Sequence, residues 1–153
     1  MITLQKMTAK EFSDYSQKTI QAYAKEKQQT EHIPLSEAIK NAEAEYQHLL
    51  PLGLATKENY LYTIQDDDKV KGRIWLATYR GNPEIAFIYD ILIYPTFQNQ
   101  GLGTKAIILA EKEMKKHGYK FLQLHVFGNN PRAIHVYEKL GLKATDIIMQ
   151  KRI

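Results

Sequence analysis

Apolar residues recur along the chain with two different periods, and each period assigns its segments to helix or strand. Two amphipathic helices are expected in the first third of the chain. Thr8 and Glu11 form a capping box at the start of the first helix. Ser36 opens the second helix, and Pro51 terminates it. The polar residues between the helices, Lys25 to Pro34, are expected to form a mobile connection.

The middle of the chain carries the pattern of strands. Three strands joined by short turns predict an antiparallel meander, and the third of them is apolar at nearly every position. A strand of that kind is covered on both faces, so we take it as the central strand of the sheet. The expected order is a strand at 2–6, the two helices, strands at 60–64, 70–79 and 85–94, a helix at 102–116, a strand at 121–127, a helix at 131–140 and a last strand at 145–151.

The chain of 153 residues has the length of one ordinary domain, and no repeat, linker or low-complexity stretch divides it. It contains no cysteine, which excludes disulfides, thiolate metal sites and a cysteine nucleophile. The N-terminus lacks the features of a signal peptide, and Asp90 interrupts the longest apolar run, so no membrane segment is expected. We therefore predict one α/β domain over residues 1–153, located in a reducing cytoplasm.

Charge and histidine spacing argue against two further classes of protein. The net charge of +4 is spread over dispersed lysines, and no basic cluster interleaves with aromatic residues. We therefore expect no nucleic-acid surface. The five histidines show no His-Glu-x-x-His or similar spacing, so we expect no metal.

A glycine-containing loop, Gln98 to Gly103, lies between the central strand and the next helix. Glycines let the backbone approach a ligand, and the N–H groups at a helix N-terminus favour an anion such as a pyrophosphate. A dinucleotide fingerprint is excluded because Leu122 to Leu124 stand where its acidic residue belongs, and a P-loop is excluded because Thr104 precedes Lys105. The loop is therefore interpreted as a phosphate-binding site made of main-chain amides. The alternative is a turn whose glycines serve only the entry into the helix.

A second motif, Asn130 to Leu142, follows the next expected strand. Asparagine at a cap, Pro131 at the first helical position and Gly141 at the end explain the bounds of a helix. Its expected buried stripe consists of Ala133, Val136 and Leu140. On this interpretation Tyr137 is an aromatic residue of the core.

Together the two motifs, Q-x-x-G-x-G and N-x-x-A-x-x-x-Y-x-x-x-G-L, resemble the paired motifs of the GNAT superfamily of N-acetyltransferases. FIYD before the loop and LHVFGNN before the last helix look like its bacterial YycN type. The order of elements also matches, so the resemblance covers nearly the whole chain. It implies a GNAT-like acyl-CoA N-acyltransferase fold, an α/β (α+β mixed sheet) fold whose mostly antiparallel sheet is flanked by helices and splayed between the central strand and the next.

The resemblance further implies that acetyl-CoA, as cosubstrate, inserts into the splayed sheet. The backbone of Ile91 and Ile93 would pair with its pantetheine arm. Asn130 would bond the same arm, and Tyr137 would face the sulfur.

The pyrophosphate would lie on the glycine loop, with Gln98 and Asn99 at the loop entrance. Many relatives carry arginine where Gln98 stands, so we expect no positive charge at that corner. The amides around the pyrophosphate would be those of Gln100, Gly101, Leu102, Gly103 and Thr104.

Acetyl transfer to an amine requires a donor for the developing oxyanion, an acid for the leaving thiolate and a base for the amine. We assign the donor to the backbone N–H of Ile91, expected at a strand bulge, and the acid to Tyr137. The base has three candidates. Burial in an apolar strand should raise the pKa of Asp90 unless a partner compensates, and a hydrogen-bonded structural carboxylate is the alternative. The second candidate base is His125, on the adjoining strand, and the third is Glu84, at a turn.

The sequence thus predicts an acetyl-CoA-dependent N-acetyltransferase that acetylates a primary amine by direct attack in a ternary complex. A catalytically silent acyl-CoA-binding sensor is the alternative, and the presence of Tyr137 argues against it. The N-terminal helices and residues 25–34 are expected to line the amine side. The acceptor is open between a polyamine, an aminoglycoside, an amino acid and a protein N-terminus, and a homodimer is also left open.

Overall fold

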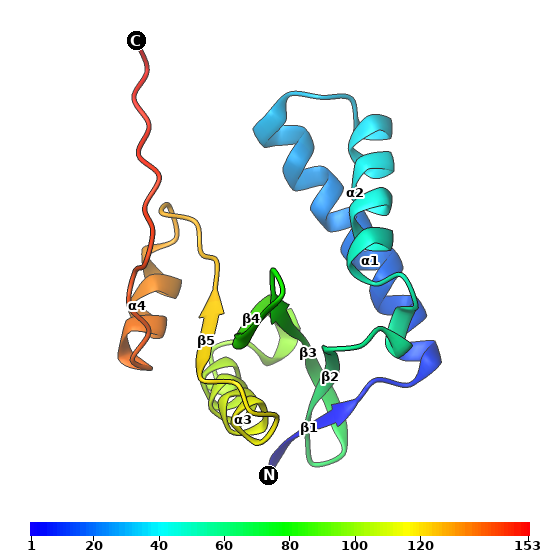
Figure 1. Cartoon of the computed structure of the whole chain (residues 1–153), viewed down its shortest axis with the longest axis vertical. Coiled ribbons are helices and arrows are strands. Elements are labelled where there is room, and N and C mark those ends of the chain that lie inside the picture. Colours follow the sequence, from blue (N-terminus) through cyan, green and yellow to red (C-terminus); the bar gives the residue numbers. More distant parts are fainter.

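A computed structural model describes all 153 residues and shows one mixed sheet of five strands with helices on both faces (Figure 1). The strands lie in the order β1-β2-β3-β4-β5. Strands β1 to β4 pair antiparallel, and β5 pairs with β4 in parallel. The elements are β1 Ile2–Lys6, α1 Ala9–Glu31, α2 Leu35–Leu49, η1 Gly53–Ala55, β2 Asn59–Asp66, β3 Lys69–Tyr79, β4 Asn82–Ile93, η2 Pro95–Phe97, α3 Leu102–Lys116, β5 Phe121–Leu124 and α4 Pro131–Lys139.

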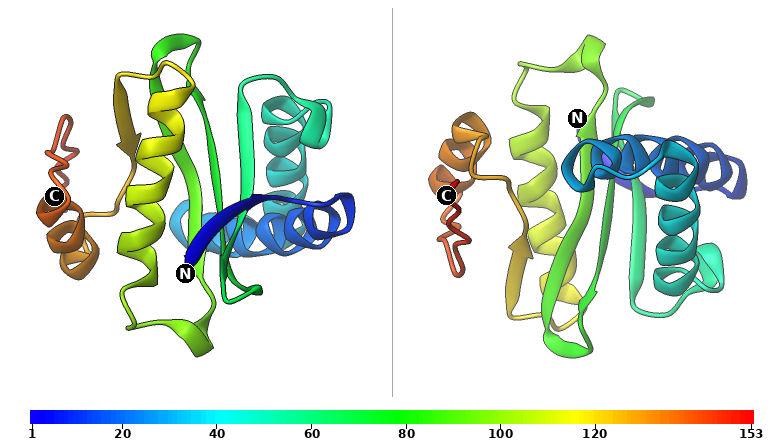
Figure 2. Two further views of the ribbon diagram at one scale, coloured as in Figure 1. Left: turned by 90° about the horizontal axis from the view of Figure 1, so that it is seen from below. Right: turned by 90° about the horizontal axis from the view of Figure 1, so that it is seen from above.

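Helix α3 covers one face of the sheet, and α1 and α2 lie over the other (Figure 2). The core under α3 contains Tyr62, Ile64, Ile74, Leu76, Ala86, Ile88, Ala106, Ile107, Ala110 and Met114. On the opposite face, Leu61 and Trp75 pack with Tyr15 of α1 and with Leu50. Successive residues of β2 and β3 therefore enter different cores, as the alternation of side chains along a strand requires.

The predicted fold class is confirmed, and one statement about its centre is wrong. Residues 85–94 fall largely within β4 and are covered on both faces, but β4 lies fourth in the sheet and β3 is the middle strand. The difference arises because no strand follows β5 in the sheet. No helix in the structure combines the length and the apolar character that crossing a membrane would require.

The connection expected at residues 25–34 is mostly helix, because α1 continues to Glu31. Lys27 and Glu31 form an ion pair one turn apart, at 3.3 Å. The hydroxyl of Tyr23 donates to Glu45 of α2 at 3.0 Å. Ala24 is fully buried between the two helices. The stretch is rich in lysine, glutamate and glutamine, which favour helix, and α1 continues into it from the turn that packs against α2, so most of it is helical rather than a mobile connection.

Two expected strands differ from the structure at the C-terminal end. β5 ends at Leu124 rather than Phe127. The strand expected at 145–151 does not form, and residues 143–153 are exposed throughout. A strand pattern becomes a strand only where a neighbouring strand accepts its backbone hydrogen bonds, and this segment has no such neighbour within its own chain.

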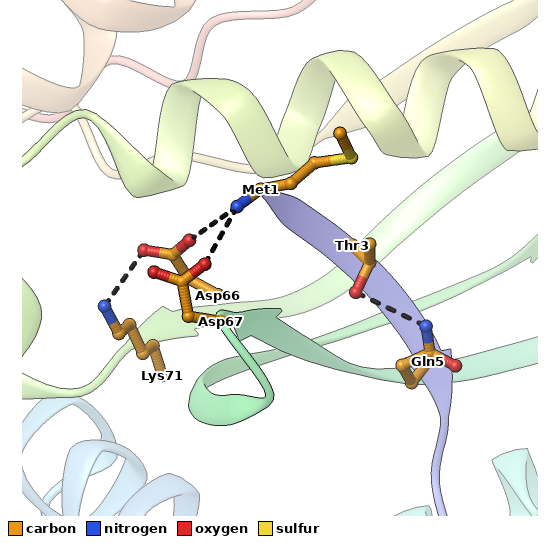
Figure 3. A network of polar contacts seen from close by, with 6 residues as sticks. All are labelled: Met1, Thr3, Gln5, Asp66, Asp67 and Lys71. Atoms are coloured by element: carbon orange, nitrogen blue, oxygen red, sulfur yellow. Dashed lines mark hydrogen bonds and ion pairs between the residues drawn. The ribbon is translucent and has the colours of Figure 1, made fainter.

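The N-terminus is held at the turn between β2 and β3 (Figure 3). The Met1 ammonium donates to Asp66 at 3.3 Å and to Asp67 at 3.2 Å, and Lys71 donates to Asp66 at 3.0 Å. The hydrogen bond from Lys71 and that from Met1 lower the pKa of the Asp66 carboxyl. These contacts tie the start of the edge strand β1 to the neighbouring hairpin.

Candidate active site

A β-bulge interrupts β4 inside the sheet. Trp75 of β3 is paired with Asp90, whereas Leu76 is paired with Ile88, so Tyr89 is the extra residue. Such a bulge bends its strand and re-aims the side chains around it. From the sequence, the bulge is expected at Ile91. It lies earlier because the register against β3 fixes its place, and one strand's sequence does not contain that register.

Strands β4 and β5 separate directly beside the bulge. Their parallel pairing joins Ile85–Ile88 to Phe121–Leu124 and goes no further. A cleft of about 230 Å³ opens there, which confirms the predicted splay. It is lined by Ile88, Tyr89, Asp90, Ile91, Leu124, His125, Val126, Phe127, Asn130, Ala133 and Tyr137.

Beyond the bulge, the backbone of β4 has hydrogen-bonding groups on the side of this cleft. The N–H of Tyr94 donates to the carbonyl of Lys71 in β3 at 2.9 Å. Because successive residues of a strand direct their backbone groups to opposite sides, those of Ile91 and Ile93 point away from β3. The side chain of Gln98 accordingly reaches the Ile93 carbonyl at 2.8 Å. Main chain is thus presented at an edge that β5 leaves free.

The loop from Gln98 to Gly103 enters α3 without a side-chain cap. Gly101 is the N-cap residue, with a φ of 75°, in the left-handed region that favours glycine. Thr8 caps α1 and Asn130 caps α4, whereas no side chain bonds the first N–H groups of α3. A Cβ at Gly101 would meet no atom within 4 Å. These amides are therefore open to a ligand, as an anion site at a helix N-terminus requires.

Positive charge reaches this loop from α4. The guanidinium of Arg132 donates to the side-chain oxygen of Asn99. The expectation that the corner lacks a cation, because Gln98 replaces arginine, is therefore wrong. The cation comes from a residue 33 positions further along the chain, on another element.

Helix α4 brings Asn130 and Tyr137 to the wall of the cleft. The side-chain oxygen of Asn130 accepts the N–H of Ala133 at 3.2 Å, as an N-cap does. Tyr137 also packs against the core under α3. Burial raises the pKa of its hydroxyl above the ordinary 10.0, which favours the protonated form. The expected buried stripe of α4 is only partly buried, since no residue of this helix is buried completely.

Asp90 is not the isolated carboxylate that its apolar strand suggested. Its Oδ2 accepts hydrogen bonds from the Nε of Arg73 and the hydroxyl of Tyr15, both at 3.0 Å. The guanidinium of Arg73 also lies 4.9 Å from the centre of the Tyr15 ring. The other oxygen, Oδ1, accepts no hydrogen bond. Asp90 is thus a compensated carboxylate with one oxygen free, on the face of the sheet that α1 covers.

The other two base candidates lie in different places. His125 lines the cleft, with its ring 4.8 Å from that of Phe127. Glu84 lies outside the cleft, near the start of β4, and pairs with Lys120 at 2.9 Å. The structure thus brings Asp90 and His125 to the same cavity and leaves Glu84 apart.

Local sequence patterns do not identify three residues of this region as site residues: Tyr15, Arg73 and Arg132. Tyr15 was indistinguishable from the other apolar residues of α1. Arg73 did carry a signal, because a cation inside a strand with apolar neighbours requires a partner when the strand is buried. Its partner, however, is 17 residues away on another strand.

A larger hollow, of about 420 Å³, lies between α3 and the N-terminal strand. It shares Gln100 and Leu102 with the glycine loop and also contains Asp66 and Lys105. None of the candidate acid or base residues lines it. We therefore take the cleft between β4 and β5 as the candidate active site.

The sequence as a whole is similar to proteins named as N-acetyltransferases. The Acetyltransferase (GNAT) family model matches residues 17–142. The uncharacterized N-acetyltransferase YdgE of Bacillus subtilis is 30% identical over 153 residues, which cover 99% of this chain and 98% of YdgE. The uncharacterized N-acetyltransferase YycN of the same organism is 30% identical over 154 residues, which cover 99% of each chain.

Solved structures agree with this relationship. The crystal structure of YycN superposes with a TM-score of 0.88 at 29% identity and covers 100% of this chain and 99% of that one. AAC(6')-Iy, in complex with the bisubstrate analogue CoA-S-monomethyl-acetylneamine, shares the fold with a TM-score of 0.63 at 14% identity, over 100% of this chain and 98% of that one. The chain therefore belongs to the GNAT family of acetyltransferases, as an N-acetyltransferase whose family uses acetyl-CoA as cosubstrate.

Proposed function

We propose that this chain transfers an acetyl group from acetyl-CoA directly to a primary amine in the cleft between β4 and β5. The observation that supports this most is that a tyrosine, a carboxylate and a histidine line one cleft together with the free edge of a bulged strand. Acetyl-CoA supplies an activated thioester, so the chain's own contribution is mainly positioning, hydrogen-bond donation and proton transfer.

The chain would hold acetyl-CoA mostly by its backbone. The uncapped amides from Gln100 to Thr104 would receive the pyrophosphate, and Arg132 would add a positive charge there. Ile91 and Ile93 would pair with the pantetheine arm along the free edge of β4. Asn130 would bond the same arm from the start of α4. These roles fit the residues because the amides are open and the edge is unpaired.

Two donors would stabilise the negative charges that develop on the oxyanion and on the sulfur during transfer. The N–H of Ile91 lies on the free side of β4, where it would donate to the developing oxyanion. The hydroxyl of Tyr137 would give its proton to the departing sulfur. Because burial raises its pKa above 10.0, the hydroxyl carries its proton throughout the neutral range and can give it up only as negative charge develops on the sulfur.

The acid and the carboxylate lie toward opposite faces of the sheet. Tyr137 packs against the core under α3, whereas Asp90 bonds Tyr15 of α1. The gap between β4 and β5 joins both sides in one cleft. The coenzyme would therefore enter on the α3 side and the amine on the α1 side.

Aromatic rings surround the proposed amine side. Tyr89 stacks on Trp75 with ring centres 4.9 Å apart and meets Phe87 edge to face at 5.0 Å. Phe87 in turn stacks on Tyr79 at 4.4 Å. Cationic amines are attracted to ring faces and to carboxylates such as that of Asp90. This supports an acceptor whose amine is protonated in solution and whose body has a flat or apolar part.

Asp90 and His125 are the two bases that this cleft offers. We propose Asp90, because its free Oδ1 lies on the amine side, where a carboxylate binds an ammonium group before taking its proton. His125 lies on the opposite wall, after β5. Loss of the base is therefore expected to affect the amine step and to leave coenzyme binding intact.

The proposed function is tested by measuring release of the coenzyme A thiol with four kinds of amine: a polyamine, an aminoglycoside, an aromatic amino acid and a peptide N-terminus. We expect amine-dependent release, highest with an amine that carries an aromatic or apolar part. Binding of acetyl-CoA without release by any amine would instead support the sensor alternative.

Gly101→Val is predicted to abolish the rise in melting temperature that acetyl-CoA causes. Ligand at about 100 times its dissociation constant adds about 2.7 kcal/mol of stability, and a branched side chain at this open position blocks the approach of the pyrophosphate. Gly118→Val is the matched control, because Gly118 has the same left-handed backbone and open surroundings at the other end of α3. An equal rise in melting temperature with acetyl-CoA in both variants would contradict pyrophosphate binding at the glycine loop.

Tyr137→Phe is predicted to lower turnover about a hundredfold while acetyl-CoA affinity is unchanged, since general acid catalysis contributes about that much. Because the pKa of Tyr137 is raised, the wild-type rate should keep this acid up to pH 10 and lose it only above. The variant should lack that alkaline loss. Tyr60→Phe, whose hydroxyl bonds Tyr119 outside the cleft, is the control. If Tyr137→Phe keeps full turnover under conditions where the chemical step is rate-limiting, the hydroxyl is not the acid and Tyr137 has only a packing role.

Asp90→Asn is predicted to lower turnover mainly near neutral pH, where the amine needs a base, and less at high pH, where the amine deprotonates unaided. Tyr15→Phe removes one hydrogen bond to Asp90 but keeps the carboxylate, so its turnover should stay closer to wild type. A pH–rate profile with melting temperatures recorded in parallel checks both. An equal loss at all pH values, or unfolding, would make Asp90 structural.

A further inference from the structure

Arg73 places a positive charge inside the sheet, on a strand whose other residues are mostly buried. Ile74, Trp75 and Leu76, which follow it in β3, are all buried. The Arg73 side chain itself is 12% exposed. A cation removed from water to this extent requires a compensating partner. Arg73 does not line the cleft between β4 and β5, so it has no direct contact with a substrate bound there.

Arg73, Asp90 and Tyr15 form a closed group in which each side chain contacts the other two, and we call it the Asp90 cluster. The Nε of Arg73 and the hydroxyl of Tyr15 both donate to Oδ2 of Asp90. The guanidinium of Arg73 also lies over the ring of Tyr15. The three side chains come from β3, from β4 beside its bulge and from α1. Each member is therefore held from two directions.

The two donors occupy a single oxygen of the Asp90 carboxylate. A carboxylate oxygen has two lone-pair sites, and Arg73 and Tyr15 account for both of those on Oδ2. Burial and the charge of Asp90 raise the pKa of the Tyr15 hydroxyl, so this group remains a donor. Two donors on one oxygen restrain the orientation of the whole carboxylate. Only Oδ1 is left to bind an ammonium group or to take its proton.

Arg73 is also the one cation that contacts Asp90. The other titratable groups that pack around Asp90 or share its cleft are Tyr15 of α1, Tyr46 of α2, Tyr89 of β4, Tyr137 of α4 and His125 after β5. Burial raises the pKa of each of these tyrosines, so all four are uncharged at neutral pH. A guanidinium is always charged, and a nearby positive charge favours the ionised form of a carboxylate. Arg73 therefore opposes the loss of charge that burial favours.

We propose that Arg73 is a positioning residue for the acetyl transfer: it holds the Asp90 carboxylate with Oδ1 toward the amine side of the cleft and favours its ionised form. This inference rests on the proposed function, because it requires Oδ1 to take the proton that the ammonium group must lose before its nitrogen attacks. Arg73 acts through Asp90, since it contacts that carboxylate and does not line the cleft.

A guanidinium suits both parts of this role. It is planar, its Nε donates in a fixed direction, and it stacks on an aromatic ring as Arg73 does on Tyr15. A lysine ammonium would supply the charge without the stacking or the fixed direction. Methionine would keep an apolar stem and lose the charge. Arg73→Lys therefore removes the orienting part alone, and Arg73→Met removes both parts.

Profiles of kcat against pH test the proposal, with saturating acetyl-CoA and the most active amine of the thiol-release assay. In Arg73→Met the midpoint on the acid side should rise by about one to three pH units, because the neighbouring cation is lost. In Arg73→Lys this midpoint should stay near that of the wild type. The maximal kcat should fall about ten- to a hundredfold in both variants, because Oδ1 is less well placed. Affinity for acetyl-CoA should be unchanged.

Lys71→Met is the matched control. Lys71 lies on the same strand and pairs with Asp66 at the same distance of 3.0 Å, and its side chain is 16% exposed, but neither residue lines the cleft. Its profile should match that of the wild type. Titration of the Asp90 carboxyl followed by carbon-13 NMR, without substrates, is a second readout that needs no activity. Its midpoint should rise in Arg73→Met and stay unchanged in Lys71→Met.

The outcomes separate this inference from the proposed function. If Asp90→Asn keeps the wild-type profile, Asp90 is not the base and the proposed function is wrong on that point. If Asp90→Asn changes the profile but folded Arg73→Met keeps the wild-type midpoint and maximal kcat, Arg73 is only structural and the inference is overturned. Should Arg73→Met fail to fold, Arg73→Lys decides, because a wild-type maximal kcat in that variant would overturn the orienting role.

Discussion

The interruption of backbone pairing between β4 and β5 is the constraint on which the rest of the site depends. The strands are joined only up to Ile88 and Leu124, and the bulge at Tyr89 bends β4 at the same level. Backbone groups inside a protein are nearly always paired. An unpaired stretch of β4 therefore leaves donors and acceptors for a ligand to satisfy, so the fold itself creates a binding edge within a sheet.

The same gap lets two polar side chains share a cavity while each belongs to a different layer. Tyr137 is partly buried against the core under α3, and this burial raises the pKa of its hydroxyl. Asp90 lies in the layer under α1, where Arg73 and Tyr15 compensate for the removal of its charge from water. A continuous sheet would separate these environments completely. The interruption brings a neutral donor and a paired carboxylate to one cleft.

Helix α4 connects the site to the end of the chain. It brings Asn130 and Tyr137 to the cleft and Arg132 to the glycine loop, yet it buries no residue completely. Its position is therefore held by fewer apolar contacts than that of α3.

The sequence by itself determined the order of elements as far as α4, the glycine loop from Gln98 to Gly103, and the position of Tyr137 on a helix, because periodicity, caps and short motifs are local. The tertiary structure alone decided the bulge at Tyr89, the contacts of Arg73 with Asp90 and of Arg132 with Asn99, and the unpaired state of residues 145–151. Each of these depends on register or contact between elements distant in the chain, and local residue patterns do not identify the partner.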